Sequence, residues 1–191
     1  QHLILDKISE NHLLWSAELG VGYFPVKDIP YDDRYFDKYV QMEKTAIGKE
    51  LNNFRVNLVE TYSNKENVLD VGIGSGAFVK CSDYFKGFDI NKKAINWLHA
   101  QNKWGTVLNV HENMTFWDSL EHIHDPTPIL NNIKNKAYIS CPIYKDVEHI
   151  LRSKHFRKDE HCWYWTSAGL IWFMEQHNFE LLHCENTETE I

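Results

Sequence analysis

The sequence contains few cysteines, and they are widely spaced. Its four cysteines are Cys81, Cys141, Cys162 and Cys184 in a chain of 191 residues. This spacing excludes a dense disulfide framework, and the lack of a CxxC pair removes a common zinc and redox motif. We therefore expect reduced thiols in a cytoplasmic protein.

Long apolar runs are also absent. A helix that spans a membrane needs about 20 consecutive apolar residues. The longest obvious run, residues 168–174, is much shorter, and no signal peptide is visible. We therefore expect no membrane association.

Positive charge is in deficit. The chain has 20 Lys and Arg residues against 27 Asp and Glu residues, which gives a net charge of −7. Binding along a nucleic acid usually requires a basic face. The acidic balance argues against a nucleic-acid partner but leaves a local basic groove open, and it does not indicate an oligomeric state.

Alternating strand and helix signals fill the middle of the chain. We predict strands at residues 68–71, 86–90, 107–110, 114–117 and 137–141, and helices at residues 76–84, 92–100 and 126–133. This alternation predicts an α/β fold of the Rossmann-like kind, with a doubly wound, mostly parallel sheet and helices on both faces.

The two ends of the chain differ from this pattern. Apolar residues at three- and four-residue steps predict helix within residues 33–62, so residues 1–64 are expected to form an N-terminal helical cap or substrate region. This region would pack on the same domain as residues 65–191. Thr166 is expected to cap a helix that ends near His177, and residues 179–184 to form a sixth strand. A seventh strand would be short or missing.

Three glycines stand within five residues in VLDVGIGSGAF, between a predicted strand and a predicted helix. No Gly-Lys-Ser/Thr follows, so a Walker phosphate loop is excluded. Gly72, Gly74 and Ala77 fit a dinucleotide pattern, and Asp89 follows Asp70 by 89 − 70 = 19 residues. An acid at that position can accept both hydroxyls of an adenosine ribose. The pattern predicts nucleoside binding and leaves a nicotinamide dinucleotide and S-adenosylmethionine as alternatives.

Four ordered segments carry a family resemblance: VLDVGIGSG, GFDIN, FWDSLEHIHDP and AYISCP. Together with the later stretch HFRKDEHCWYWTSAGLIWFMEQHNFELL, they resemble class I S-adenosylmethionine-dependent methyltransferases across roughly residues 66–184. The nearest resemblance is to the branch with ubiquinone-biosynthesis O-methyltransferases and uncharacterised bacterial and phage members. It implies S-adenosyl-L-methionine as the cofactor and methyl transfer to a small-molecule oxygen or nitrogen.

The resemblance also implies a cofactor site. Gly72 to Gly76 would lie under the methionine portion with Asp70 near its amino end, Asp89 would bind the ribose, and Ile90 would pack on the adenine. Trp117 would face the adenine or the sulfonium, or pack in the core. The expected cofactor-binding residues are Asp70, Gly72, Ile73, Gly74, Gly76, Asp89, Ile90, Trp117 and Asp118.

The spacing Asp118-x-x-Glu121-His122 can place two carboxylates and an imidazole on one face of a helical turn. Similar patterns bind a divalent metal in plant small-RNA 2′-O-methyltransferases and in some ubiquinone-pathway enzymes. In this chain, His155 or His161 could complete such a set from the later loop. His122 could also act as a general base without a metal, or Glu121 and His122 could simply satisfy backbone groups at a loop–helix junction. We take His122 and Glu121 as catalytic residues and expect no bound metal; Asp118, Glu121 and His122 are the candidates if one binds.

Aromatic residues gather in the first and last thirds of the sequence. We expect Tyr23, Tyr35, His161 and Trp163 to contact a small, partly apolar methyl acceptor. Two other functions stay open: a nucleic-acid or protein methyltransferase, and a nucleoside-binding module without catalysis.

The sequence departs from its relatives between Asp89 and Asn113. Only 113 − 89 = 24 residues separate them, and the relatives usually place a longer third strand and another helix there. In the relatives an acid in this region binds the adenine amine, and here the polar candidates are His111, Glu112 and Asn113. Asn113 also stands where an acid is common. Adenine recognition is therefore expected to differ.

Overall fold

The computed structural model describes residues 6–8, 12–26, 33–64 and 66–189. Their contacts divide the chain into two compact units. The parallel-sheet unit comprises residues 31–117, 128–139 and 185–191, and the mixed-sheet unit comprises residues 1–30, 118–127 and 140–184.

The parallel-sheet unit contains four strands in the order β5-β4-β6-β7. They are β4 (Val68–Val71), β5 (Phe85–Phe88), β6 (His111–Trp117) and β7 (Ile133–Ser140). Strands β5 and β6 both pair with β4 in parallel. Because the chain moves to one side of β4 for β5 and to the other side for β6, the strand order reverses there. In open α/β sheets, ligands bind outside the carboxyl ends of the strands at such a point.

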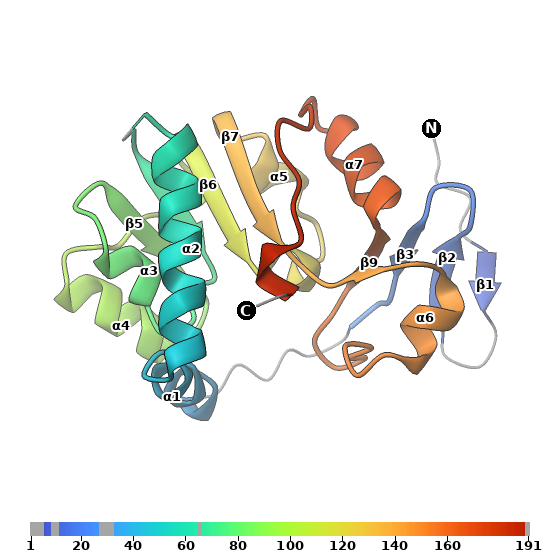
Figure 1. The fold of residues 1–191 in the computed structure, drawn as a ribbon, viewed down its shortest axis with the longest axis horizontal. Helices are drawn as coiled ribbons and strands as arrows, with labels where there is room; N and C mark the ends of the chain where they lie inside the picture. Colours follow the sequence, from blue (N-terminus) through green and yellow to red (C-terminus); the bar gives the residue numbers. More distant parts are fainter. Residues whose placement is uncertain (1–5, 9–11, 27–32, 65, 190–191) are drawn as a thin grey trace. The chain divides into compact units, whose positions relative to one another are not determined.

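Helices cover this sheet: α1 (Asp33–Met42), α2 (Ala46–Tyr62), α3 (Ala77–Lys80) and α4 (Lys92–Ala100). In Figure 1, α2 runs along the sheet. Val59 of α2 is fully buried in a core cluster with Val68, Phe85 and Leu98. Short elements complete the unit, namely α5 (Thr127–Leu130) at its border and the 3₁₀ helix η2 (Thr187–Thr189).

The mixed-sheet unit contains five strands in the order β1-β2-β3-β9-β8. They are β1 (Asp6–Ile8), β2 (Leu13–Ser16), β3 (Val21–Tyr23), β8 (Ile143–Tyr144) and β9 (Trp163–Thr166). All pairs are antiparallel except β8 with β9. The unit also holds η1 (Leu120–His122), α6 (Val147–Arg152) and α7 (Ser167–Glu175).

The predicted α/β fold with a mostly parallel sheet is confirmed. The helix beginning at Thr166 is also confirmed, because the Thr166 hydroxyl accepts the Gly169 N–H at 3.0 Å. The long helix predicted within residues 33–62 is interrupted, since Thr45 caps a new helix by accepting the Gly48 N–H. From the sequence we expect an N-terminal cap (residues 1–64) and a cofactor-binding domain (residues 65–191). This functional division stays a prediction.

Two predicted strands are wrong. Residues 107–110 form turns and coil, with Leu108 83% exposed, so they bury no strand face. Residues 179–184 are coil, and Leu181 and Leu182 are more than half exposed. The strand in this part of the chain is β9 instead, because its Tyr164 and Trp165 are fully buried between neighbours. Among the described helices, none is long and apolar enough to span a membrane.

Candidate active site

The glycine cluster forms the turn between β4 and α3. The φ angles of Gly72, Gly74 and Gly76 are 83°, 54° and 80°, in the left-handed region that glycine enters without strain. The Gly72 N–H donates to the Phe88 carbonyl at 2.8 Å, and the Gly76 N–H donates to the Ile73 carbonyl at 2.8 Å. The turn is therefore fixed by backbone hydrogen bonds at the point where the strand order reverses.

Asp89 lies directly beyond β5 and braces this turn. Its Oδ2 accepts the Ile73 N–H at 3.0 Å, and its Oδ1 accepts the Asn91 N–H at 2.7 Å. Burial raises the pKa of Asp89, while the backbone hydrogen bonds oppose that rise. Each carboxylate oxygen can accept further donors, so the side chain can hold the turn and still bind a ribose hydroxyl. The neighbouring Ile90 is 63% exposed.

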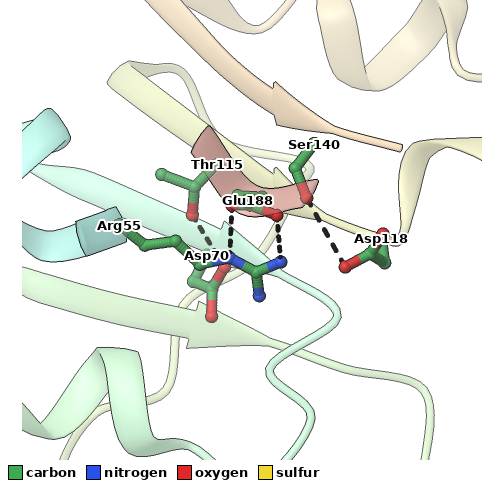
Figure 2. Close-up of polar contacts among 6 residues, drawn as sticks. All are labelled: Arg55, Asp70, Thr115, Asp118, Ser140 and Glu188. Atoms are coloured by element: carbon green, nitrogen blue, oxygen red, sulfur yellow. Dashed lines mark hydrogen bonds and ion pairs between the residues drawn. The ribbon is translucent and has the colours of Figure 1, made fainter. Parts of the chain in front are cut away.

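Asp70 is buried at the carboxyl end of β4, with an exposed fraction of 1%. It accepts the Thr115 hydroxyl at 2.7 Å (Figure 2). Burial raises its pKa to about 7, while the Thr115 hydrogen bond and the positive charge of Arg55 lower it. Asp70 is therefore poised to gain or lose a proton near neutral pH.

Arg55 of α2 was not among the predicted site residues. Its Nε and Nη2 donate to the two carboxylate oxygens of Glu188 at 2.8 and 2.9 Å (Figure 2). Its guanidinium also lies over the Trp117 ring, 5.1 Å from the centroid. Arg55 precedes the buried Val59 by one helical turn, so the same helix face carries both. That spacing could have marked Arg55 as an inward-facing cation.

Trp117 ends β6 and packs in the core, as one of its two predicted roles requires. It is 8% exposed, and its ring meets Phe78 edge-on at 5.6 Å. Its indole N–H finds no hydrogen-bond partner among the residues that the structure describes. A buried donor without a partner costs free energy.

Glu121, His122 and His161 converge in the mixed-sheet unit. One potential ligand atom from each lies within 4.8 Å of the other two. Glu121 and His161 are almost fully buried, with exposed fractions of 2% and 4%. The Cys162 N–H donates to the Glu121 carbonyl at 2.7 Å, which ties the later segment to η1. The structure therefore brings together Glu121 and His122, predicted as catalytic, with His161, predicted as a substrate contact.

Both imidazoles of this cluster favour the neutral form. Burial lowers the pKa of His122, and burial with the nearby positive charges lowers the pKa of His161 to about 3. His122 Nδ1 lies 2.9 Å from the Glu160 carbonyl. Since a carbonyl only accepts, Nδ1 carries the hydrogen and Nε2 keeps its lone pair. This arrangement is typical of histidines that bind metal or accept a proton.

Asp118 does not belong to the three converging residues. Its N–H donates to the Ser140 carbonyl at 2.8 Å, and its φ of 52° turns the chain sharply after β6. The Ser140 hydroxyl donates to its Oδ2 at 3.4 Å (Figure 2). Its negative charge nevertheless opposes the lowering of the His122 pKa, so Asp118 acts on the cluster through its charge.

The predicted acceptor contacts are only partly together. Tyr23 and Trp163 pack against each other, with ring centroids 4.9 Å apart, and the Tyr23 hydroxyl hydrogen-bonds His124 Nδ1 at 3.0 Å. The Trp163 indole N–H donates to the Ile123 carbonyl at 2.9 Å, next to His122. The side chain of Tyr35 lies outside the described residues.

These features define a Rossmann-like α/β fold together with a second group of one carboxylate and two imidazole side chains. Residues 41–184 match the profile of a family described as a methyltransferase domain, and the chain belongs to this family. It is a class I S-adenosylmethionine-dependent methyltransferase, as the resemblance in the sequence implied.

A solved structure shows the same fold. The chain is similar to the magnesium protoporphyrin IX methyltransferase ChlM from Synechocystis PCC 6803, solved with bound SAH. The TM-score is 0.55 at 11% sequence identity, and the match covers 80% of this chain and 88% of that chain. Comparison with curated protein sequences gave no match.

Proposed function

We propose that the protein transfers a methyl group from S-adenosylmethionine to an oxygen atom of a small-molecule acceptor, with a divalent cation held by Glu121, His122 and His161. The observation that carries the proposal is the convergence of these three ligand atoms within 4.8 Å. It revises the expectation that no metal binds, and it favours His161 over His155 as the later histidine that completes the set.

The donor set fits a cation. Two neutral imidazoles and one carboxylate suit transition metals such as Mn²⁺, Co²⁺ and Zn²⁺. Burial favours neutral imidazoles at His122 and His161, and the Glu160 carbonyl orients His122 so that Nε2 is available. A bound cation would attract an acceptor hydroxyl and lower its pKa.

The cofactor residues have separate tasks. S-adenosylmethionine supplies a methyl group on a sulfonium. Gly72, Gly74 and Gly76 carry no side chains, so the backbone of the turn allows close approach of the cofactor's methionine end. Asp89, held by the Ile73 and Asn91 N–H groups, would accept the ribose hydroxyls, and ionised Asp70 would face the ammonium group.

Three observations support a small-molecule acceptor. The net charge of −7 is unfavourable for a nucleic-acid substrate, and the structurally similar ChlM is named for a porphyrin substrate. The aromatic pair Tyr23 and Trp163 offers an apolar contact in the mixed-sheet unit. We also propose, from the sequence resemblance, that the protein belongs to the branch of ubiquinone-biosynthesis O-methyltransferases.

His122 as a metal-free general base is the second candidate. Its lowered pKa keeps Nε2 unprotonated at neutral pH, so it could remove a proton from an oxygen or a nitrogen acceptor. This alternative predicts activity that chelators leave unchanged.

Calorimetry with Mn²⁺, Co²⁺ and Zn²⁺ tests the metal site directly. The wild type should bind at least one of these cations, and Glu121→Gln and His161→Asn should each weaken binding more than roughly tenfold, as loss of a ligand or its support does. His183→Asn, an exposed histidine, is the matched control. No binding at millimolar metal would remove the cation from the proposal.

A tritium-methyl transfer assay with hydroxylated and amino aromatic compounds tests the acceptor type. Transfer to the hydroxylated compounds that a chelator abolishes and added metal restores is the expected result. Chelator-resistant transfer would favour His122 as the base, and selective transfer to the amines would contradict the oxygen acceptor.

A further inference from the structure

Glu188, in the 3₁₀ helix η2, forms an ion pair with Arg55. Glu188 and Arg55 form a two-pronged ion pair at 2.8 and 2.9 Å (Figure 2), and their side chains are only 24% and 14% exposed. Paired N–H···O bonds of this kind are the preferred geometry for arginine and a carboxylate. The pair joins residues 133 positions apart in the sequence.

Arg55 lies at the carboxyl ends of β4 and β6. Its charge acts on Asp70, the third residue of β4, and its guanidinium covers Trp117, the last residue of β6. Asp70 directly precedes Val71 and the glycine turn. The guanidinium of Arg55 therefore acts through its charge on the carboxyl group of Asp70, which lies beside that turn.

These two groups complement an amino acid. The methionine end of S-adenosylmethionine carries one carboxylate and one ammonium, so Arg55 and Asp70 offer the opposite charges. Glu188 supplies the same carboxylate to Arg55 from within the chain. A free cofactor and Glu188 cannot both occupy the two donors Nε and Nη2.

We propose that Arg55 is the binding site for the cofactor's carboxylate and that Glu188 occupies this site as a built-in competitor. The inference rests on the proposed use of S-adenosylmethionine. Cofactor binding then requires Glu188 to leave Arg55, and the apparent affinity is reduced by the fraction of molecules in which the pair is closed.

The segment around Glu188 can move away from Arg55 without exposing much buried surface. Residues 180–186 are exposed, including Leu181 and Leu182. The Thr187 hydroxyl donates to Glu185 at 2.7 Å, a contact that lies within the segment and moves with it. Release of Glu188 therefore exposes little apolar area.

Calorimetry with two ligands tests the competition. S-adenosylhomocysteine carries the amino-acid end, whereas 5′-methylthioadenosine lacks it. Glu188→Gln should bind S-adenosylhomocysteine roughly tenfold more tightly than the wild type, with no change for 5′-methylthioadenosine. Glu180→Gln removes the same charge from an exposed position of the preceding segment and should match the wild type for both ligands.

Arg55→Gln provides the complementary test. It should weaken S-adenosylhomocysteine by roughly tenfold or more, as loss of a hydrogen-bonded charge does, and leave 5′-methylthioadenosine bound, which also shows that the variant is folded. Unchanged or weaker S-adenosylhomocysteine binding by Glu188→Gln would overturn the competition. Equal tightening of both ligands would overturn it too, because a carboxylate would then not be the group that competes. Failure of the wild type and every variant to bind either ligand would overturn the proposed function and the competition with it.

Discussion

Asp70 shows how much the chemistry of one residue depends on its surroundings. The side chain is buried, so removal from water raises its pKa from 3.8 to about 7. The hydrogen bond from the Thr115 hydroxyl and the positive charge of Arg55 lower the pKa and offset part of this rise. An acid kept in this state by the fold is more typical of a binding site than of a strand end.

Asp70 should make stability depend on pH. The pKa is higher in the folded protein than in the unfolded chain, so the resulting stability is fully present below about pH 4 and is lost as pH rises through 7. The difference in the free energy of unfolding between the wild type and Asp70→Asn should therefore fall by roughly 2–3 kcal/mol from pH 5 to pH 8. Urea unfolding at both pH values measures it.

Asp83→Asn is the control for this comparison, because Asp83 is exposed. Its unfolding free energy should follow that of the wild type at both pH values. A constant difference between the wild type and Asp70→Asn would show that Asp70 is ionised in the folded protein throughout.

At the scale of elements, the turn between β4 and α3 depends on two glycines for different reasons. A Cβ on Gly76 would lie 2.5 Å from the Trp97 ring, whereas a Cβ on Gly74 would lie 3.4 Å from Tyr39, an ordinary contact. Both residues have positive φ angles. Gly76 therefore faces a steric conflict that Gly74 does not.

Gly74→Ala and Gly76→Ala form a matched pair that separates these effects. Gly74→Ala should destabilise the protein by roughly 1–2 kcal/mol through its φ angle alone. Gly76→Ala should cost roughly 1–3 kcal/mol more because the Trp97 ring must move. Thermal or urea unfolding of both variants measures the costs, and equal losses would contradict the role of Trp97.

The order of elements explains which strands were predicted correctly. Strand β4, the glycine turn and β5 follow one another within residues 68–88, so local patterns specify them. Strand β9 and its partner β3 lie more than 100 residues apart, and the run Trp163–Thr166 by itself does not indicate its partner. The apolar residues at 179–184 predicted a strand there, but no described strand pairs with them.

At the scale of the whole molecule, the two proposed ligands are assigned to different units. The glycine turn, Asp70 and Asp89 belong to the parallel-sheet unit, whereas Glu121, His122 and His161 belong to the mixed-sheet unit. A ligand slows local opening of the elements that bind it. Each ligand should therefore protect its own set of backbone amides.

Hydrogen exchange can test this assignment. S-adenosylhomocysteine should slow exchange in peptides covering residues 68–91, and Mn²⁺ should slow exchange in peptides covering residues 120–123 and 160–163. Asp89→Ala should abolish the first effect and preserve the second. Protection of the glycine turn by Mn²⁺ alone would contradict the assignment of the metal to Glu121, His122 and His161.

The sequence by itself determined the class of fold, the glycine turn and the position of Asp89. These features are local, because a buried strand, a glycine turn and the acid beyond the next strand lie within about one strand–helix–strand repeat. The same local order carried the resemblance to class I methyltransferases, which the family match confirms.

Only the tertiary structure decided which distant residues meet. His161 joins Glu121 across 161 − 121 = 40 residues because the Cys162 N–H bonds the Glu121 carbonyl. Arg55 meets Glu188 across 133 residues, so no local pattern could connect them. Burial, which raises the pKa of Asp70 and lowers the pKa values of His122 and His161, likewise exists only after the chain has folded around these side chains.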